Sequence, residues 1–327
     1  MPIPRKLFSV LELPVLTALL READLKFVDI GGRGSAFYPL LTLAPFAHYF
    51  VSEPDAREAA ALAERLPLEA PWRAVTVMAE AIAGRHGTAE LHVTAEPGMS
   101  SLLEPDSTVA RRFVLASKFA VSSRASVSVC PLDDAAARYG FADAVFLKAD
   151  TQGTELDVLG SGPALVDALL GVHTEAMFQP FYTGQAMFAD IDSHLRARGF
   201  ALFSLSRTTL RRSGYRKGSY SKRAPAWAHC LYLREPETLL STGGGLRRRA
   251  AALLALAVAF QHFDLAAEIV AVIGRTGVLT GPDLSGLADE VGRAADMSTR
   301  YLLQKAPDEA VAEGLLAPTL RDRSQLE

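Results

Sequence analysis

Two apolar segments near the start of the chain each end in a carboxylate. The first contains Asp29 and runs into a turn with three glycines, Gly31, Gly32 and Gly34. Glycines let the backbone approach a ligand closely, and a carboxylate before such a turn can pair with a cationic amino group. The second segment ends at Glu53, where a carboxylate can accept hydrogen bonds from both ribose hydroxyls. Together these residues predict a nucleoside-cofactor site, whereas a tight turn and a helix N-terminal acid are the purely structural alternatives.

The third apolar segment ends at Glu80 and Ala81, which are followed by Ile82. Backbone groups here, or the Glu80 carboxylate, could bind the edge of an adenine, and Ile82 could wall its face. A plain loop start is the alternative. A dinucleotide-binding turn would instead place Gly-x-Gly-x-x-Gly directly at the N-terminus of a helix.

Two further carboxylates, Asp150 and Glu175, follow or end later apolar segments. Open α/β sheets bind ligands at the carboxyl ends of their strands, so both are expected at one edge. They could orient or deprotonate an attacking hydroxyl, or hold a divalent cation, which is the less favoured alternative. Glu155 begins a helix, so it could be either a structural cap or a part of the site. We expect His173 to be buried one layer deeper than Glu175.

Candidate substrate contacts come from an aromatic segment and from a basic one. Tyr182, in Gln179-Pro180-Phe181-Tyr182, could stack on a sugar or exclude water, with core packing as the alternative. Arg211 and Arg212 belong to a basic linker, and the chain has no acid from Leu195 to Arg234. A solvated loop is one interpretation, and a lid over a phosphate-bearing or anionic substrate is the other.

The order of elements along the chain predicts a Rossmann-like α/β sheet. We expect seven strands, at Lys26–Ile30, His48–Ser52, Ala74–Met78, Val145–Lys148, Val172–Ala176, Phe200–Leu205 and Ala228–Leu233. Helices are expected at Asp55–Arg65, Leu132–Arg138, Glu155–Leu159, Gly162–Leu169 and Phe188–Arg198.

The ends of this series distinguish it from other Rossmann-like sheets. The last two strands leave no room for a helix in the usual place, so we expect them to pair as an antiparallel hairpin. A mostly parallel sheet with such a reversed strand is characteristic of class I methyltransferases. Ala89–Thr94 alternates polar and apolar residues and predicts an added strand, whereas Glu96–Asp106 has the composition of a loop.

The segments Phe146–Leu159 and Val172–Leu205 closely resemble the FkbM-type methyltransferases. The shared pattern is a Lys-x-Asp-x-x-Gly-x-Glu turn, a strand-ending Glu, an aromatic-rich Pro-x-Tyr segment and a Gly-Phe that enters the sixth strand. Four shorter segments also match, namely Phe27–Gly34, Ser52–Asp55, Ser100–Pro105 and Trp227–Arg234.

This resemblance covers residues 25 to 236. It implies S-adenosyl-L-methionine as cofactor and O-methylation of a hydroxyl, often on a glycan, glycolipid or natural product. Many members carry Asn after the Gly-Ala step of the first loop, whereas this chain has Arg33, as in a subgroup with a Gly-Ala-Arg-Gly loop.

The composition of the 327 residues, 49% hydrophobic and 22% charged, is that of an ordinary soluble protein. The formal net charge of −3 argues against a nucleic-acid or anionic-membrane partner for the whole chain. Two cysteines cannot make a disulfide framework or a zinc site, which favours the cytoplasm, and we expect no metal ligands of that kind. Glu12 and Pro14 interrupt the first apolar stretch, so we expect a leading helix there and not a signal peptide. Ala250–Ile273 is too polar to span a membrane.

Three domains are expected: a helical lead-in at 1–24, the methyltransferase-like domain at 25–236 and a helical appendage at 237–327. The appendage begins near the triplet Gly243-Gly244-Gly245 and carries more apolar side chains in 247–273 than one helix face requires. It should therefore pack on a further surface, either of the same chain or of a second copy in a homodimer.

Two other functions remain open on the sequence alone. A nicotinamide-dependent oxidoreductase is disfavoured because Asp29 precedes the glycines and no Tyr–Lys pair is evident. A non-catalytic cofactor-binding scaffold acting through the helical appendage is the other. The preferred interpretation is methyl transfer to a small-molecule or glycan acceptor.

Overall fold

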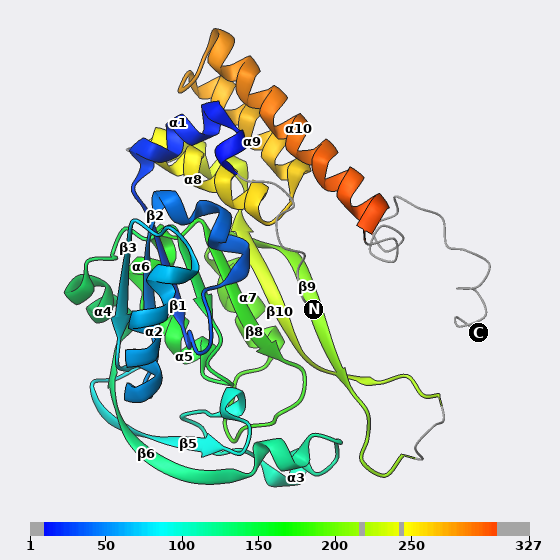
Figure 1. Cartoon of the computed structure of the whole chain (residues 1–327). Coiled ribbons are helices and arrows are strands. Elements are labelled where there is room, and N and C mark those ends of the chain that lie inside the picture. Colours follow the sequence, from blue (N-terminus) through cyan, green and yellow to red (C-terminus); the bar gives the residue numbers. More distant parts are fainter. Residues whose placement is uncertain (1–9, 216–219, 242–244, 306–327) are drawn as a thin grey trace. The chain divides into compact units, whose positions relative to one another are not determined.

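A computed structural model describes residues 10–215, 220–241 and 245–305 of the chain (Figure 1). The chain forms two compact units. The sheet unit comprises Asp24–Phe37 and Ala44–Thr238, and the helical unit comprises Met1–Ala23, Tyr38–Leu43 and Leu239–Glu327. The three domain limits expected from the sequence stay a prediction, but the structure groups the first helix with the last ones.

The sheet unit is built on a seven-stranded sheet in the order β3-β2-β1-β7-β8-β10-β9. The strands are β1 Leu25–Ile30, β2 Ala47–Ser52, β3 Ala74–Met78, β7 Phe146–Ala149, β8 Gly171–Met177, β9 Phe200–Leu210 and β10 Ala224–Arg234. Five neighbouring strands are parallel, and β10 runs antiparallel to both β8 and β9. The predicted class I methyltransferase fold is confirmed by this order and by the reversed strand.

The last two strands are longer than the sequence predicted. The register of β10 on β9 extends from Ala224↔Leu210 to Arg234↔Phe200, whereas strands at 200–205 and 228–233 were expected. Residues 206–210 contain Thr208 and Thr209, whose β-branched side chains favour extended structure. The Arg, Ser and Gly residues around them are typical of a loop, so the two strands were predicted too short.

The helices of the sheet unit are α2 Ala56–Glu69, α4 Leu132–Tyr139, α5 Glu155–Gly160, α6 Pro163–Ala168 and α7 Phe188–Ala197. Asp55 caps α2 by accepting hydrogen bonds from the backbone N–H groups of Arg57 and Glu58. The helices cover a core that includes Leu147, Leu159 and Val172, none of which is exposed. Burial of these apolar side chains fixes the strand ends that carry the candidate site.

A second, three-stranded sheet has the order β4-β6-β5. Its strands are β4 Ala81–Ile82, β5 Gly87–Thr94 and β6 Val121–Cys130. The sequence predicted only the strand at 89–94. β6 escaped prediction because its serine-rich sequence buries only Val127, Val129 and Cys130. Between β5 and β6 lie η3 Pro97–Met99, α3 Ser107–Ala110 and η4 Ala116–Phe119, where a loop was expected over part of the range.

The helical unit contains α1 Pro14–Ala23, α8 Leu246–Ala259, α9 Phe263–Thr276 and α10 Gly281–Lys305, with η1 Val10–Glu12 before them. The short helices η2 Tyr38–Phe46 and η5 Pro236–Ser241 lie where the chain passes between units. α1 packs on α8 and α10, and α9 packs on both α8 and α10. Within the described ranges, no helix has the length and apolar character needed to cross a bilayer.

The apolar side chains that suggested a second packing surface for the appendage are already covered. From Ala250 to Val258 every residue of α8 is buried in the single chain, and Leu253, Leu254 and Leu256 have no exposed area. Gly243 and Gly244, which would give the appendage reach, lie outside the described residues. These α8 side chains therefore offer no surface to a second copy.

Candidate functional site

The candidate site lies where the parallel strands of the large sheet end. Ile30, the last residue of β1, pairs with Ser52 on one side and with Ala149 on the other, and Ala149 pairs with Thr174. The residues that follow these positions therefore stand side by side. They include four predicted groups, namely Gly31, Glu53, Asp150 and Glu175.

The glycine turn after β1 is packed so closely that side chains are excluded. Gly31 has a φ of +78°, and a Cβ there would lie 2.1 Å from the carbonyl oxygen of Asp150. A Cβ on Gly32 would lie 2.2 Å from Val51 Cγ1. Gly34, at a φ of +95°, has open space where its Cβ would be. The first two glycines let β1, β2 and β7 meet, whereas at the third it is the positive φ that favours glycine.

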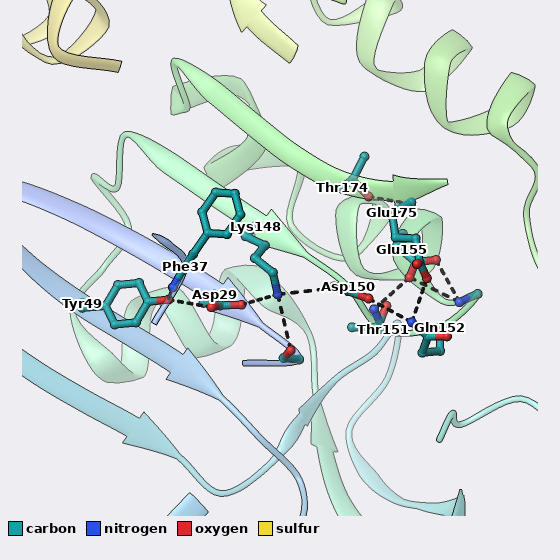
Figure 2. A network of polar contacts seen from close by, with 12 residues as sticks. Asp29, Phe37, Tyr49, Lys148, Asp150, Thr151, Gln152, Glu155, Thr174 and Glu175 are labelled. Atoms are coloured by element: carbon teal, nitrogen blue, oxygen red, sulfur yellow. Dashed lines mark hydrogen bonds and ion pairs between the residues drawn. The ribbon is translucent and has the colours of Figure 1, made fainter. Parts of the chain in front are cut away.

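Asp29 is only 2% exposed and has two partners within the chain (Figure 2). Tyr49 Oη donates to its Oδ2 at 2.6 Å, and Lys148 Nζ donates to its Oδ1 at 2.8 Å. Burial disfavours the charged form of Lys148, but the charges of Asp29 and Asp150 outweigh it and raise the pKa of the ammonium group. A contact between Asp29 and a cofactor amine would thus use the remaining lone pairs of a carboxylate that is already positioned.

Of the two carboxylate oxygens of Glu53, one accepts a hydrogen bond from the described residues and the other does not. It is 4% exposed, and its Oε1 accepts a hydrogen bond from the Asp55 backbone N–H at 2.9 Å. In the part of the chain that the structure describes, nothing donates to its Oε2. Burial raises the pKa of the carboxyl group. A buried carboxylate with a free acceptor beside a glycine turn fits the ribose hydroxyls of a nucleoside.

Glu80 is held by α4 and β2, whereas Ala81 is held by the second sheet. The carboxylate of Glu80 accepts two hydrogen bonds from Arg138 Nη1, at 3.0 and 3.1 Å. Its carbonyl oxygen accepts from Ser52 Oγ at 2.6 Å. Ala81 begins β4 and pairs with Val129. Their contact with an adenine stays a prediction, in which the Glu80 carboxylate is less free than expected.

Three carboxylates meet at the ends of β7 and β8 (Figure 2). Atoms from Asp150, Glu155 and Glu175 lie within 4.8 Å of one another. The sequence predicted that Asp150 and Glu175 share one edge, but it did not place Glu155 beside them. A set of carboxylates at this spacing could bind a proton or a cation, so their hydrogen-bond partners decide what each can do.

Glu155 is engaged by the turn that precedes its own helix. It is 1% exposed, and its Oε1 accepts from the Thr151 N–H at 2.8 Å while its Oε2 accepts from the Gly153 N–H at 3.0 Å. Burial raises its pKa to about 7. These contacts support the structural role that the sequence left open for Glu155.

Asp150 and Glu175 are joined by Gln152, which the sequence did not single out. Gln152 Nε2 donates to Asp150 Oδ1 at 3.0 Å and to Glu175 Oε2 at 2.7 Å. Glu175 is 4% exposed, and burial, reinforced by the charge of Asp150, raises its pKa well above the usual range. The side chain of Asp150 is 25% exposed, so it is the more accessible of the pair.

The backbone of Gln152 is itself unusual. Its φ is +58°, a left-handed conformation that a residue with a Cβ rarely adopts. Such strain persists where surrounding contacts determine the conformation, and it concentrates at functional sites. In the sequence, the position of Gln152 between Asp150 and Gly153 was the available indication of its role. These residues belong to the Lys-x-Asp-x-x-Gly-x-Glu turn, which also contains Lys148.

Tyr182 completes this network from the aromatic segment. It is 1% exposed, and its Oη lies 2.9 Å from Gln152 Oε1 and 2.8 Å from the Met99 carbonyl oxygen. Burial raises its pKa, which keeps the phenol protonated as a donor. Its role as a substrate contact stays a prediction, and the observed contacts position Gln152.

His173 lies beneath the site, as expected for a residue two positions before Glu175. Its ring packs 4.6 Å from that of Phe37 and 5.7 Å from that of His229. Burial lowers its pKa to about 3, so the imidazole is neutral. It supports the strand and has no contact with the three carboxylates among the described interactions.

Arg211 and Arg212 follow β9 and contact the segment around α3 and η4. The Arg211 carbonyl oxygen accepts from the Val114 N–H at 3.2 Å, and Arg212 forms a β-bridge with Phe113. Arg212 is exposed, whereas Arg211 is half-buried. Two other members of the predicted basic segment, Arg216 and Lys217, lie outside the described residues.

Residues 48–202 match the family model described as the methyltransferase FkbM domain. No curated protein matches the chain significantly.

Several solved structures match the chain at low identity and low TM-score. Magnesium protoporphyrin IX methyltransferase from Synechocystis PCC 6803 is 13% identical, with 68% of this chain and 76% of that chain covered and a TM-score of 0.34. A putative tRNA (m1A22) methyltransferase from Streptococcus pneumoniae is 9% identical, with 86% and 97% covered and a TM-score of 0.33. A human methyltransferase 10 domain containing protein is 12% identical, with 71% and 83% covered and a TM-score of 0.28.

Proposed function

We propose that this chain, whose residues 48–202 match the methyltransferase FkbM domain, uses S-adenosyl-L-methionine as its cofactor and methylates a hydroxyl oxygen of its acceptor. We infer that the acceptor is a glycan, a glycolipid or a natural product. The observation that carries the proposal is the pairing of Asp150 and Glu175 through Gln152 at the sheet edge that also holds the glycine turn and Glu53.

The glycine turn and two acids would hold the cofactor. Gly31, Gly32 and Gly34 let the backbone approach it, and Glu53 Oε2 would accept the ribose hydroxyls. Asp29, oriented by Tyr49 and Lys148, would face the amino group of the methionine portion. When bound, S-adenosyl-L-methionine supplies an activated methyl group on a sulfonium.

The acceptor side is served by the carboxylate pair. The hydroxyl oxygen would take the methyl group that bound S-adenosyl-L-methionine supplies, with sulfur as the leaving group, and the hydroxyl proton would pass to the pair. Asp150 is the accessible member, and the charge on Asp150 and the burial of Glu175 favour retention of one proton between them. Because this displacement depends chiefly on alignment, orientation of the hydroxyl is the main contribution of these residues.

The test is methyl transfer from labelled cofactor. The purified chain is incubated with S-adenosyl-L-methionine labelled on the methyl group and with fractionated cell extract, and the labelled product is identified. Label on an ether oxygen supports the proposal, whereas label on nitrogen or carbon contradicts O-methylation. Calorimetric titration with S-adenosyl-L-methionine and with a nicotinamide dinucleotide separates this enzyme from an oxidoreductase. Cofactor binding without transfer to any acceptor would favour the scaffold.

A further inference from the structure

Two segments far apart in the sequence of the sheet unit carry basic residues and no acids. Residues 107–132 contain Arg111, Arg112, Lys118 and Arg124 without Asp or Glu, and 195–234 is likewise free of acids. Glu and Asp are common elsewhere in the chain, which has 37 acidic against 34 basic residues. The charge of these two segments is therefore a local excess within a slightly acidic protein.

The structure brings the two segments together. The Ser213 N–H donates to the Arg112 carbonyl oxygen at 2.9 Å, and Ser213 Oγ donates to that of Arg111 at 2.7 Å. With the bridge between Phe113 and Arg212, these bonds form a short antiparallel contact. It brings the backbone at Arg111 and Arg112 beside that at Arg211 and Arg212, and we call these four residues the basic surface.

The guanidinium groups of the basic surface are not neutralised by the protein. Within the described ranges, no carboxylate oxygen lies within 4.0 Å of any of them, and Arg111, Arg112 and Arg212 are exposed. In the same unit, Arg124, Arg138 and Arg196 each pair with a glutamate or an aspartate. Asp106, the nearest acid in sequence to Arg111 and Arg112, accepts hydrogen bonds from Thr108 and Val109 as the cap of α3.

Packed aromatic rings connect the basic surface to the part of the candidate site that contains Asp150 and Glu175. Beneath it, Phe113 is buried with its ring 5.5 Å from that of Phe181. Phe119 stacks on Phe181 at 4.9 Å and lies 5.8 Å from the ring of Tyr182, which contacts Gln152. The Arg212 guanidinium lies 5.1 Å from the centre of the Phe113 ring, which restrains it. A continuous aromatic core thus joins the arginines to the network that holds Asp150 and Glu175.

We propose that the basic surface binds a phosphate group of the acceptor, at a distance from the hydroxyl that is methylated. This inference rests on the proposed function, because it assigns the acceptor to the class of phosphorylated or diphosphate-linked glycans. An anion that binds to these arginines would supply the negative charge that the described residues do not supply. Arginine binds phosphate oxygens in bidentate geometry, and a phosphate monoester or a diphosphate carries more than one negative charge.

A small phosphorylated acceptor fits the surface better than a long polyanion. The two acid-free segments belong to a chain that has a net charge of −3 as a whole. A nucleic acid or an anionic bilayer would extend beyond these segments to the rest of a chain whose net charge is negative. The probes below therefore include both, and their preference over small phosphates would overturn the proposal.

The test is calorimetric titration of the full chain with inorganic pyrophosphate and with glucose 1-phosphate at low ionic strength. We expect millimolar or tighter binding that weakens at higher salt. The double variant Arg112→Gln/Arg212→Gln should weaken it by at least about tenfold. Arg275→Gln, which removes an exposed arginine of α9, is the matched control and should leave binding unchanged. A second double variant, Arg111→Gln/Arg112→Gln, keeps the contact of Arg212 with Phe113 and tests charge without disturbing that packing.

The outcomes separate this inference from the proposed function. Affinity for S-adenosyl-L-methionine, measured on the same proteins, should not change in either double variant. Absence of pyrophosphate binding, or equal binding by wild type and both variants, overturns the basic surface as a phosphate site. Tighter binding of phosphatidylglycerol vesicles or of single-stranded RNA than of either small phosphate also overturns it. A chain that binds pyrophosphate as expected but not S-adenosyl-L-methionine refutes the methyl-transfer proposal alone.

Discussion

Gln152 Nε2 donates a hydrogen bond to Glu175 Oε2 at 2.7 Å, and this bond orients a carboxylate that we propose for the acceptor side of the site. The amide is oriented from its other end, where Gln152 Oε1 lies 2.9 Å from Tyr182 Oη. An amide that donates to two carboxylates must present its NH₂ group to them, and the phenol ensures this by facing the carbonyl oxygen. Tyr182 therefore acts on the carboxylate pair through Gln152.

Replacement of Tyr182 by phenylalanine tests this relationship. Loss of a hydrogen bond worth about 1 kcal/mol would let the amide rotate, and we expect kcat to fall by roughly five- to tenfold. The affinity for S-adenosyl-L-methionine should stay the same. Tyr232→Phe is the control, since its buried hydroxyl bonds Asp192 at 3.1 Å and contacts no site residue among the described interactions. Equal kcat values for the two variants would contradict the positioning role.

Asp150→Asn should lower turnover far more than it lowers cofactor affinity. The substitution removes the accessible base and leaves the side chain almost isosteric, so we expect kcat to fall by about 100-fold or more. Steady-state kinetics and calorimetry on the same preparation measure the two quantities. If a chelator abolishes the activity of the wild type, the pair acts through a bound divalent cation, whereas unaffected activity favours the base.

Glu53→Ala should weaken the binding of S-adenosyl-L-methionine by more than about tenfold, or roughly 1.4 kcal/mol. The reason is the loss of the buried carboxylate whose Oε2 is available for the ribose. Glu64→Ala, which removes an exposed glutamate from α2, is the control. Calorimetry measures both dissociation constants, and an unchanged value for the Glu53 variant would remove this residue from the site.

The large sheet was predictable because its signals are local. Buried strands are short apolar runs that end in glycine or acid, and the missing helix before β10 revealed the antiparallel hairpin. The second sheet was not, because β6 faces solvent along most of its length and its serines resemble a loop. Its pairing with β5 and β4, which are both remote in sequence, makes it a strand.

The sequence predicted the acidic residues of the candidate site but not the residues that link them. Asp150 and Glu175 follow from the rule that strand ends meet at one edge of a sheet. Gln152 could not be identified because its role depends on a φ of +58° that turns its amide toward both carboxylates. The ion pair of Lys148 with Asp29 depends likewise on the register of β7 beside β1. Such contacts are decided by tertiary structure, which a single sequence does not display.

The pKa of Glu155 predicts a specific pH dependence of stability. Burial raises it to about 7 from 4.5, so between these values the folded chain binds a proton that the unfolded chain releases. The stabilising contribution is complete below pH 4.5 and is lost as the pH rises through 7. Glu155→Gln cannot titrate. The unfolding free energy of the wild type minus that of the variant should therefore fall by up to about 3 kcal/mol over this interval.

Chemical denaturation at several pH values between 4.5 and 7 measures this difference. Other titrating groups, including His173, are common to both proteins and cancel in the subtraction. Glu64→Gln serves as the exposed control and should give a difference that does not vary with pH. Parallel pH profiles for the wild type and Glu155→Gln would show that Glu155 is ionised throughout, contrary to the structure.

Within the helical unit, Glu290 of α10 caps the start of α1. Its Oε1 accepts from the Val15 N–H at 2.7 Å and its Oε2 from the Leu16 N–H at 3.0 Å, and the residue is 1% exposed. The first N–H groups of a helix have no partner within it, so Glu290→Ala leaves two buried donors unsatisfied. We expect a loss of about 1–2 kcal/mol in the stability of this unit and faster hydrogen exchange at both amides. Glu268→Ala, which changes an exposed residue of α9, is the control. Cofactor affinity should stay constant in the Glu290 variant because every proposed cofactor contact lies in the sheet unit. Unchanged exchange at Val15 and Leu16 in the Glu290 variant would show that the cap does not hold α1 in place.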